Sequence, residues 1–169
     1  MKSKWIVFLV WALLPSPLVL AQDEISNAEI TFTFVSKDVD GSISGFRSSS
    51  TIDLDNPSNS EFKGAVSVET LKTGNFLRDW SLKGKKYFNA DDYPKISFAS
   101  TSVTTTDTGF KVTGDLTLKG KSKPITIDFT RKADQVRGTT TLFSSDFGIN
   151  VKKERKDNEV IVNFLLTLQ

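Results

Sequence analysis

Few residues of this sequence could do chemistry, because the chain of 169 residues has no cysteine and no histidine. Their absence excludes thiol nucleophiles, thiolate or imidazole metal sites and a Ser-His-Asp triad. The carboxylate pair Asp91-Asp92 is then the most obvious candidate for acid–base catalysis. Adjacent side chains point apart, however, and nothing nearby supplies a matched acid and base. We therefore expect solvated turn residues here, no catalytic residue, no metal site and a protein that is not an enzyme.

The neighbours Arg78 and Asp79 are the strongest polar candidates for binding. Arg78 could donate hydrogen bonds to a ligand headgroup at the entrance of a binding site. The interpretation that we favour is structural: an ion pair or helix contact that holds this segment on the rest of the fold. Because successive residues of a helix do not face each other, we expect the two side chains to have different partners. We also expect Trp80 to be buried beneath the same segment.

Lysines and arginines gather in three clusters, each at an expected turn or helix end, where solvated loop tips are the default interpretation. An alternative for the cluster around residues 119–123 is docking onto anionic membrane headgroups. The clusters are Lys83/Lys85/Lys86, Lys119/Lys121/Lys123 and Lys152/Lys153/Arg155/Lys156.

The N-terminus is typical of a secretory signal peptide. Two lysines precede an apolar run over residues 5–14, and small residues end at Ala21. A retained anchor is the alternative, but the run is short for a membrane span, and Pro15 and Pro17 interrupt its end. Cleavage near Ala21 would remove two of the 22 basic residues and none of the 20 acidic ones, leaving 20 of each. We thus predict a signal peptide over residues 1–21, one neutral domain over 22–169, a periplasmic or secreted location, and no nucleic-acid partner.

Apolar and polar residues alternate with a period of two through most of the remaining chain, which is typical of strands with one dry face and one wet face. Short turns favour antiparallel pairing, in a closed barrel or in a two-sheet sandwich. Residues 71–95 lack the alternation, and Thr73 could cap a helix that begins near Asn75. The eight expected strands cover about 28–36, 42–54, 62–70, 96–104, 109–119, 124–132, 135–148 and 159–168.

Several short motifs occur in an order that resembles the YceI-like family of secreted, lipocalin-like lipid-binding proteins. They are Gly45-Phe46, the run from Thr73 to Asp79, Tyr87-Phe88-Asn89, Tyr93-Pro94, Ile96-Ser97-Phe98 and the run from Val112 to Pro124. The resemblance implies an all-β fold: an extended eight-stranded antiparallel lipocalin-like barrel with one helical crossover segment and a polyisoprenoid in its pore. The chain departs from the family at Ser81, where many members have a histidine. Another histidine is often found near Ser36. A role that needs imidazole is therefore in doubt.

A hydrocarbon ligand requires a long, dry channel lined by aromatic and aliphatic side chains. Small residues recur in the inward phase (Ser48, Ser50, Gly64, Gly114 and Gly138), which favours a void. Alternatively, glycines could relieve strand bending while the phenylalanines fill the barrel completely. The residues expected to line the pore are Phe32, Phe34, Phe46, Val66, Val68, Phe98, Phe110, Val112, Phe129, Leu142 and Phe164.

The leading hypothesis is a non-enzymatic protein that sequesters a long isoprenoid lipid or quinone-like molecule and needs no cofactor. Two alternatives stay open: an enzyme that acts on a lipid or isoprenoid, and a stress-induced secreted barrel with a structural or interaction role and no ligand. The sequence leaves the oligomeric state open.

Overall fold

Residues 24–169 are described by a computed structural model of the chain, so the predicted signal peptide lies outside the described residues. The strands are β1 (Ile25–Phe34), β2 (Val39–Ile43), β3 (Arg47–Ser48), β4 (Lys63–Ser67), β5 (Lys95–Thr106), β6 (Gly109–Leu118), β7 (Lys121–Lys132), β8 (Gln135–Phe143) and β9 (Glu159–Leu168). One α-helix, α1 (Phe76–Lys83), accompanies the 3-10 turns η1 (Val35–Lys37), η2 (Pro57–Asn59), η3 (Val68–Thr70), η4 (Ser144–Phe147) and η5 (Arg155–Asn158). None of the helices within residues 24–169 is long and apolar enough to span a bilayer.

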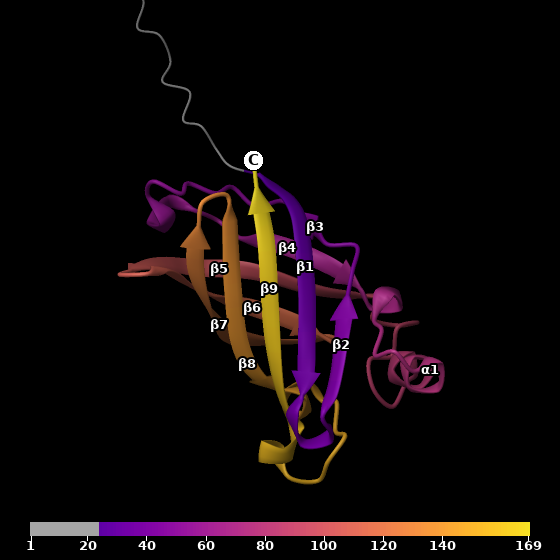
Figure 1. Cartoon of the computed structure of the whole chain (residues 1–169). Coiled ribbons are helices and arrows are strands. Elements are labelled where there is room, and N and C mark those ends of the chain that lie inside the picture. The colour runs from indigo at the N-terminus through magenta and orange to yellow at the C-terminus, as the bar shows by residue number, and fades with distance from the viewer. Residues whose placement is uncertain (1–23) are drawn as a thin grey trace, which may run out of the picture.

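The strands form one antiparallel sheet in the order β2-β1-β9-β8-β7-β6-β5-β4-β3, which curls into a half-barrel (Figure 1). The all-β antiparallel prediction and the single helical crossover are confirmed. The strand count differs by one, because the expected strand 42–54 is divided. Gly45 adopts a positive φ of 71° between β2 and β3, and this left-handed turn separates the two short strands.

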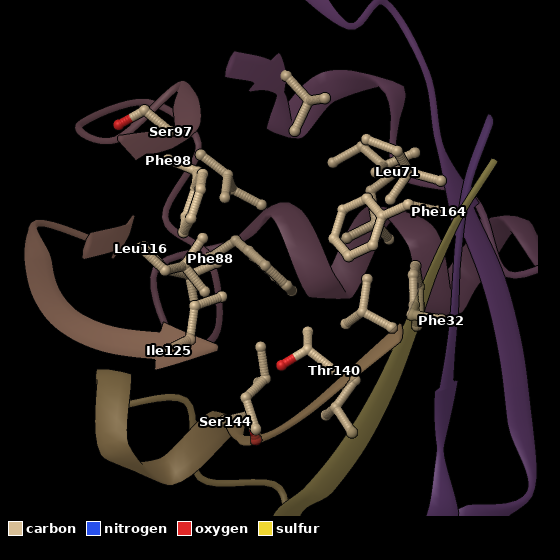
Figure 2. A pocket seen from close by; sticks show the side chains of 18 of the residues that line it. Phe32, Leu71, Phe88, Ser97, Phe98, Leu116, Ile125, Thr140, Ser144 and Phe164 are labelled. Carbon is tan, nitrogen blue, oxygen red and sulfur yellow. The ribbon is translucent and has the colours of Figure 1, made fainter. Parts of the chain in front are cut away.

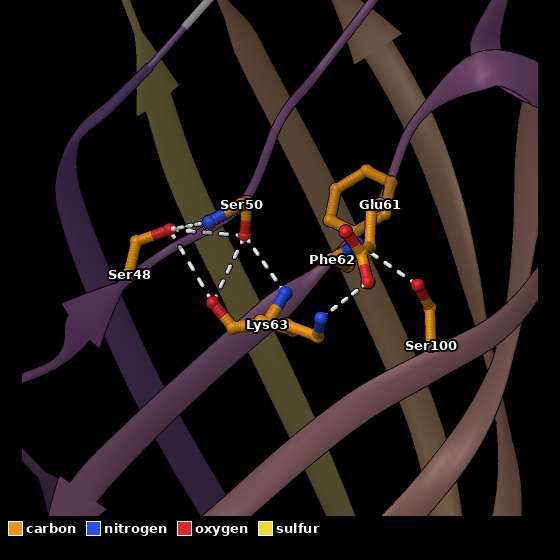
Figure 3. Close-up of polar contacts among 6 residues, drawn as sticks. All are labelled: Ser48, Ser50, Glu61, Phe62, Lys63 and Ser100. Atoms are coloured by element: carbon orange, nitrogen blue, oxygen red, sulfur yellow. Dashed lines mark hydrogen bonds and ion pairs between the residues drawn. The ribbon is translucent and has the colours of Figure 1, made fainter.

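The two edges of the sheet approach each other at one point. Ser42 and Lys72 exchange two backbone hydrogen bonds, of 2.8 and 2.9 Å, which connect β2 to the segment after η3. Serine side chains reinforce the opposite edge (Figure 3). The Ser50 hydroxyl donates to the Lys63 carbonyl oxygen and accepts from the Lys63 N–H, just beyond the end of the β3–β4 ladder. Both donor–acceptor distances are 3.0 Å. The Ser42–Lys72 bridge thus connects β2 to the segment after η3, whereas the serine bonds extend the β3–β4 pairing within one edge.

One end of the half-barrel is packed solid. Phe62, Phe110 and Phe129 form an aromatic stack with ring centroids 5.3–5.7 Å apart. Ile52, Val112, Ile127, Val136, Leu166 and Leu168 are buried around it. Buried side chains therefore fill the interior around this stack.

Candidate functional site

Beyond the aromatic stack, the interior holds a cavity of about 570 Å³ (Figure 2). Side chains from the sheet, from α1 and from the loops around η4 and η5 surround it. This volume lies within the range of about 300–1,000 Å³ that is typical of small-molecule sites. The lining is Ile25, Ile30, Phe32, Phe34, Lys37, Val39, Ile43, Phe46, Ser50, Phe62, Lys63, Gly64, Ala65, Val66, Leu71, Thr73, Arg78, Ser81, Leu82, Tyr87, Phe88, Ile96, Ser97, Phe98, Leu116, Leu118, Ile125, Ile127, Phe129, Thr140, Leu142, Ser144, Ile149, Val151, Val160, Val162, Phe164 and Leu166.

The hydroxyl groups deep in this lining already have protein partners. Thr140 Oγ1 donates to the Thr126 carbonyl oxygen at 2.7 Å, and Ser144 Oγ donates to the Ile149 carbonyl oxygen at 2.8 Å. Both residues are buried, and Figure 2 shows them on the lower wall of the cavity. Because their donors are satisfied by the backbone, an apolar ligand leaves no hydroxyl hydrogen unpaired here. The interior is suited to hydrocarbon.

All charged side chains of the lining are cationic: Lys37, Lys63 and Arg78. No aspartate or glutamate of residues 24–169 lines the cavity. Lys63 forms an ion pair with Glu61, whereas Lys37 at the end of η1 and Arg78 on α1 are exposed members of the lining. An anionic or hydrogen-bond-accepting headgroup would therefore be favoured beside Lys37 or beside Arg78, and no carboxylate pair is available in the lining for acid–base catalysis on a bound molecule.

Phenylalanine rings contact glycines in the wall. A Cβ built on Gly64 would lie 2.3 Å from the Phe46 ring, and one on Gly41 would lie 2.2 Å from the Phe32 ring. Gly114 is likewise covered by Phe98, and Gly138 by Phe129. The inward glycines therefore do not open a void by themselves, which corrects that part of the sequence interpretation. They leave room for large rings that a side chain at the same positions would displace.

Helix α1 presents Arg78, Ser81 and Leu82 to the cavity. Its N-cap is Asn75, whose Oδ1 accepts from the Arg78 N–H at 3.0 Å, so the prediction that Thr73 caps the helix is wrong. Thr73 instead donates to Asp79 Oδ1 from its N–H at 2.8 Å and from its hydroxyl at 2.6 Å. Gly74, with φ 75°, turns the chain so that Thr73 lies back over the helix.

Arg78 and Asp79 share Thr73 as their partner, contrary to the expectation of different partners. Arg78 Nε donates to Thr73 Oγ1 at 2.8 Å, and a terminal nitrogen donates to the Thr73 carbonyl oxygen at 3.4 Å. These contacts fix the crossover segment internally and do not pin it to the sheet. Since an arginine has five N–H donors, Arg78 keeps donors for a ligand after these two bonds.

The expectation that Trp80 is buried is wrong, since its exposed fraction is 73%. Trp80 lies on the side of α1 away from Arg78 and Leu82, because a step of two residues turns a helix by about 200°. Helix α1 faces the cavity with Arg78, Ser81 and Leu82, so Trp80 on its other side points into solvent.

Most of the residues expected to line the pore do surround the cavity. These are Phe32, Phe34, Phe46, Val66, Phe98, Phe129, Leu142 and Phe164. Three others are core residues outside the lining: Phe110 and Val112 pack in and around the aromatic stack, and Val68 is buried in η3. For Phe110 and Val112, alternation gives the correct face of the strand but not the depth at which packing closes the interior. For Val68, the strand has already ended.

Several lining residues come from segments without alternation, and the strand pattern could not identify them. Leu71, Phe88, Ile149 and Val151 lie in loops, and Ser81 and Leu82 lie on α1. The Tyr87-Phe88-Asn89 motif was the one local signal for this part of the wall.

The remaining charged candidates lie on the surface. Asp91 and Asp92 are exposed turn residues, and Asp92 accepts a hydrogen bond from Asn89 at 2.8 Å. Arg155 binds both carboxylate oxygens of Asp146, and this hydrogen bonding lowers the pKa of Asp146 below its ordinary value. Within residues 24–169, no group of three or more carboxylates is placed to hold a metal ion.

A curled antiparallel sheet around one apolar cavity is the architecture of small β-barrel proteins that hold a single ligand. The chain belongs to the YceI-like domain family, whose match covers residues 22–168.

Curated relatives and solved structures agree with this assignment. The UPF0312 protein plu2095 of Photorhabdus laumondii is 36% identical over 88 residues, which are 52% of this chain and 46% of that protein. The chain therefore spans about half the length of the curated relatives that it matches.

Burkholderia cenocepacia BcnA shares the fold with a TM-score of 0.70 and 20% identity, over 84% of this chain and 96% of that one. A polyisoprenoid binding domain from Saccharophagus degradans gives a TM-score of 0.58 and 12% identity, over 88% and 97%. At these identities, the two solved structures establish the fold alone.

Proposed function

We propose that this protein is an exported, non-enzymatic carrier that holds one isoprenoid or quinone-like chain in the cavity. The observation that carries the proposal is an apolar cavity of about 570 Å³ whose charged lining residues are all cationic. The family membership and the polyisoprenoid binding domain among the structural relatives support it.

The volume of the cavity limits how much chain it holds. An apolar cavity of about 150 Å³ takes one benzene, with six carbons. A cavity of 570 Å³ then holds roughly 20–25 carbons, or four to five isoprene units. Longer chains would leave their remaining units outside, because the aromatic stack closes the far end. At ~0.8 kcal/mol per buried methylene-sized group, five units contribute roughly 15–20 kcal/mol gross. Association and chain ordering take back about 4–15 kcal/mol, so several units must enter before binding is tight.

In this carrier the chain enters tail first toward the aromatic stack, and the headgroup stays beside Lys37 or Arg78. The protein excludes water from the tail and changes no covalent bond. The predicted signal peptide supports a periplasmic or secreted location for this carrier.

Native mass spectrometry of protein purified from its host without detergent tests the proposal. We expect an added mass that matches a prenyl lipid or quinone. After delipidation, farnesol, geranylgeraniol and longer polyprenols are titrated, and affinity should rise with length until the cavity is full and then level off. Protein that retains no lipid and binds none of the series would refute the carrier function.

A matched pair of variants on β9 separates the cavity from general damage. Val162 lines the cavity, whereas its neighbour Ile161 lies on the other face of the sheet and outside the lining. Val162→Trp should fill the interior and abolish the added mass, and Ile161→Trp should retain it. Equal retention by both variants would show that the lipid binds elsewhere.

A further inference from the structure

Helix α1 carries the three most exposed large apolar side chains of residues 24–169. Their exposed fractions are 81% for Phe76, 72% for Leu77 and 73% for Trp80, compared with 44% for Val35 and 39% for Tyr93. At 100° per residue the three lie on one side of the helix. Surface leucines are common singly, but a contiguous group of two aromatic residues and a leucine marks an interaction site.

This apolar side is held rigidly and faces away from the ligand cavity. The Asn75 cap and the bonds between Thr73 and Asp79 fix the first turn of α1. Leu82, on the opposite side, packs into the cluster around Leu71 and lines the cavity. In Figure 1 the helix stands beside the curled sheet, so the exposed side is free of the sheet. One short helix thus separates the cavity from an apolar surface.

The segment that carries this surface has an excess of positive charge. The segment from 71 to 94 contains five basic residues and three acidic ones, whereas residues 22–169 contain equal numbers of each. Asp79 is bound to Thr73, and Lys83 forms an ion pair with Glu69 at 3.3 Å. Lys85 and Lys86 form no ion pair with any residue between 24 and 169. Lys119 Nζ, from the β6–β7 turn, donates to the Lys86 carbonyl oxygen at 3.1 Å, which adds a third lysine.

We propose that Phe76, Leu77 and Trp80, together with Lys85 and Lys86, form a docking face for a lipid bilayer that contains anionic lipids. Tryptophan and phenylalanine favour the boundary between headgroups and acyl chains, and lysines beside them bind anionic headgroups. Docking places the helix that lines the cavity directly on the membrane. The docking itself does not depend on the cargo. Its use, the transfer of a chain between bilayer and cavity, rests on the proposed function.

A second copy of the chain fits this face less well than a bilayer does. Two aromatic side chains and one leucine bury on the order of 400–600 Å², less than the roughly 800 Å² per partner of a standard interface. A two-fold contact would also bring the lysines of both copies together, and like charges repel. An anionic surface instead pairs with both the apolar and the basic residues of the face.

Flotation with two kinds of vesicle tests the docking face, on protein in the form that its host produces. One vesicle is phosphatidylcholine alone, and the other contains about one quarter phosphatidylglycerol. We expect binding to the anionic vesicles that weakens as salt rises, since salt screens the lysines. Phe76→Gln/Leu77→Gln/Trp80→Gln should weaken it at least tenfold. Lys85→Gln/Lys86→Gln should weaken it about twenty-five-fold, from roughly fivefold for each lysine near the surface.

Lys132→Gln/Arg137→Gln, on the distant β7–β8 hairpin, is the matched charge control and should bind as the wild type does. Equal binding of the wild type and the α1 triple variant would overturn the proposal. So would a dimer in solution that the triple variant dissociates, because the face would then belong to a second copy. All these residues are exposed, so the variants should fold with unchanged Tm. Native mass spectrometry of the wild type keeps the two proposals apart: wild-type protein that holds lipid but binds no vesicles refutes only the docking face, whereas vesicle binding by protein that holds no lipid refutes only the carrier function.

Discussion

The packing of Phe46 on Gly64 gives the sharpest test of how the cavity stays open. Gly64→Ala would place a Cβ 2.3 Å from Phe46 Cε2 and 2.5 Å from Phe46 Cζ, where ordinary contact begins at 3.4 Å. The ring edge must therefore retreat by about 1 Å. The nearest backbone atom, the Arg47 carbonyl oxygen, is 3.3 Å from that Cβ, so the ring and not the backbone takes up the strain. Phe46 lines the cavity, so its ring would move inward.

The size of the expected loss in ligand affinity follows from the two ring carbons that enter the cavity. If they displace two methylene-sized groups of the ligand, binding loses ~1.6 kcal/mol, which is about fifteenfold in Kd. Overpacking should also cost about 1–3 kcal/mol of the free energy of unfolding. Isothermal titration with a prenol that fills the wild-type cavity measures the first quantity, and urea denaturation of the free protein measures the second.

A double-mutant cycle isolates this contact. Phe46→Leu removes the ring, so in that background Gly64→Ala should change neither the affinity nor the stability by more than a few tenths of a kcal/mol. The same fifteenfold loss in both backgrounds would refute the reasoning, because the effect would then not pass through the Phe46 ring. No loss in either background would show that the wall yields outward.

Three further predictions follow from other contacts. Phe62→Ala should cost about 3–5 kcal/mol of unfolding free energy. It should also raise by about one isoprene unit the prenol length at which affinity levels off, since an emptied ring site holds about six carbons. Unchanged length selectivity would mean that the aromatic stack does not end the cavity. Asn158→Ala should lower the free energy of unfolding, measured by urea denaturation, by more than 2 kcal/mol. The fully buried Asn158 side chain accepts from the N–H groups of Val151 and Lys152 and donates to the carbonyl oxygens of Lys152 and Glu154. A loss below 1 kcal/mol would contradict this account. Asp146→Asn should lower Tm at neutral pH. Because the pKa of Asp146 is depressed in the folded state, its contribution is complete above the unfolded pKa of about 3.9 and is lost as the pH falls through the lower folded value. The Tm difference should therefore shrink below about pH 4, and one that persists at the lowest pH would rule out this ionisation as its cause.

Strand alternation predicted the strands from β5 to β9, four of them with nearly the right bounds, because each pairs with its sequence neighbour. The expected strand 135–148 is too long, since β8 ends at Phe143 and the 3-10 turn η4 follows. The same pattern merged β2 and β3 into one strand, since it does not report the positive φ of Gly45. It also assigned Phe110 and Val112 to the pore wall. Their inward direction is a local property, whereas the position of the aromatic stack depends on Phe62, which precedes β4 and is distant in the sequence.

In the segment from 71 to 94, too, the sequence indicated the local structure but not the tertiary contacts. Its lack of alternation indicated a helix near Asn75. The sequence could not show that Thr73 would bind both Arg78 and Asp79, because that contact depends on the turn at Gly74. Nor could it show that Trp80 would be exposed. Burial of Trp80 depends on which side of α1 faces the cavity, and that side carries Arg78, Ser81 and Leu82.

The sequence by itself determined the all-β class, the inward face of most strands, and the exclusion of thiol and imidazole chemistry, since these depend on residue type and period alone. Only the tertiary structure decided where the aromatic stack ends the cavity, which rings pack against glycines, and which side of α1 faces solvent. Each of these depends on contacts between residues far apart in the chain, and the free energy of such contacts is set by the shape of the whole interior.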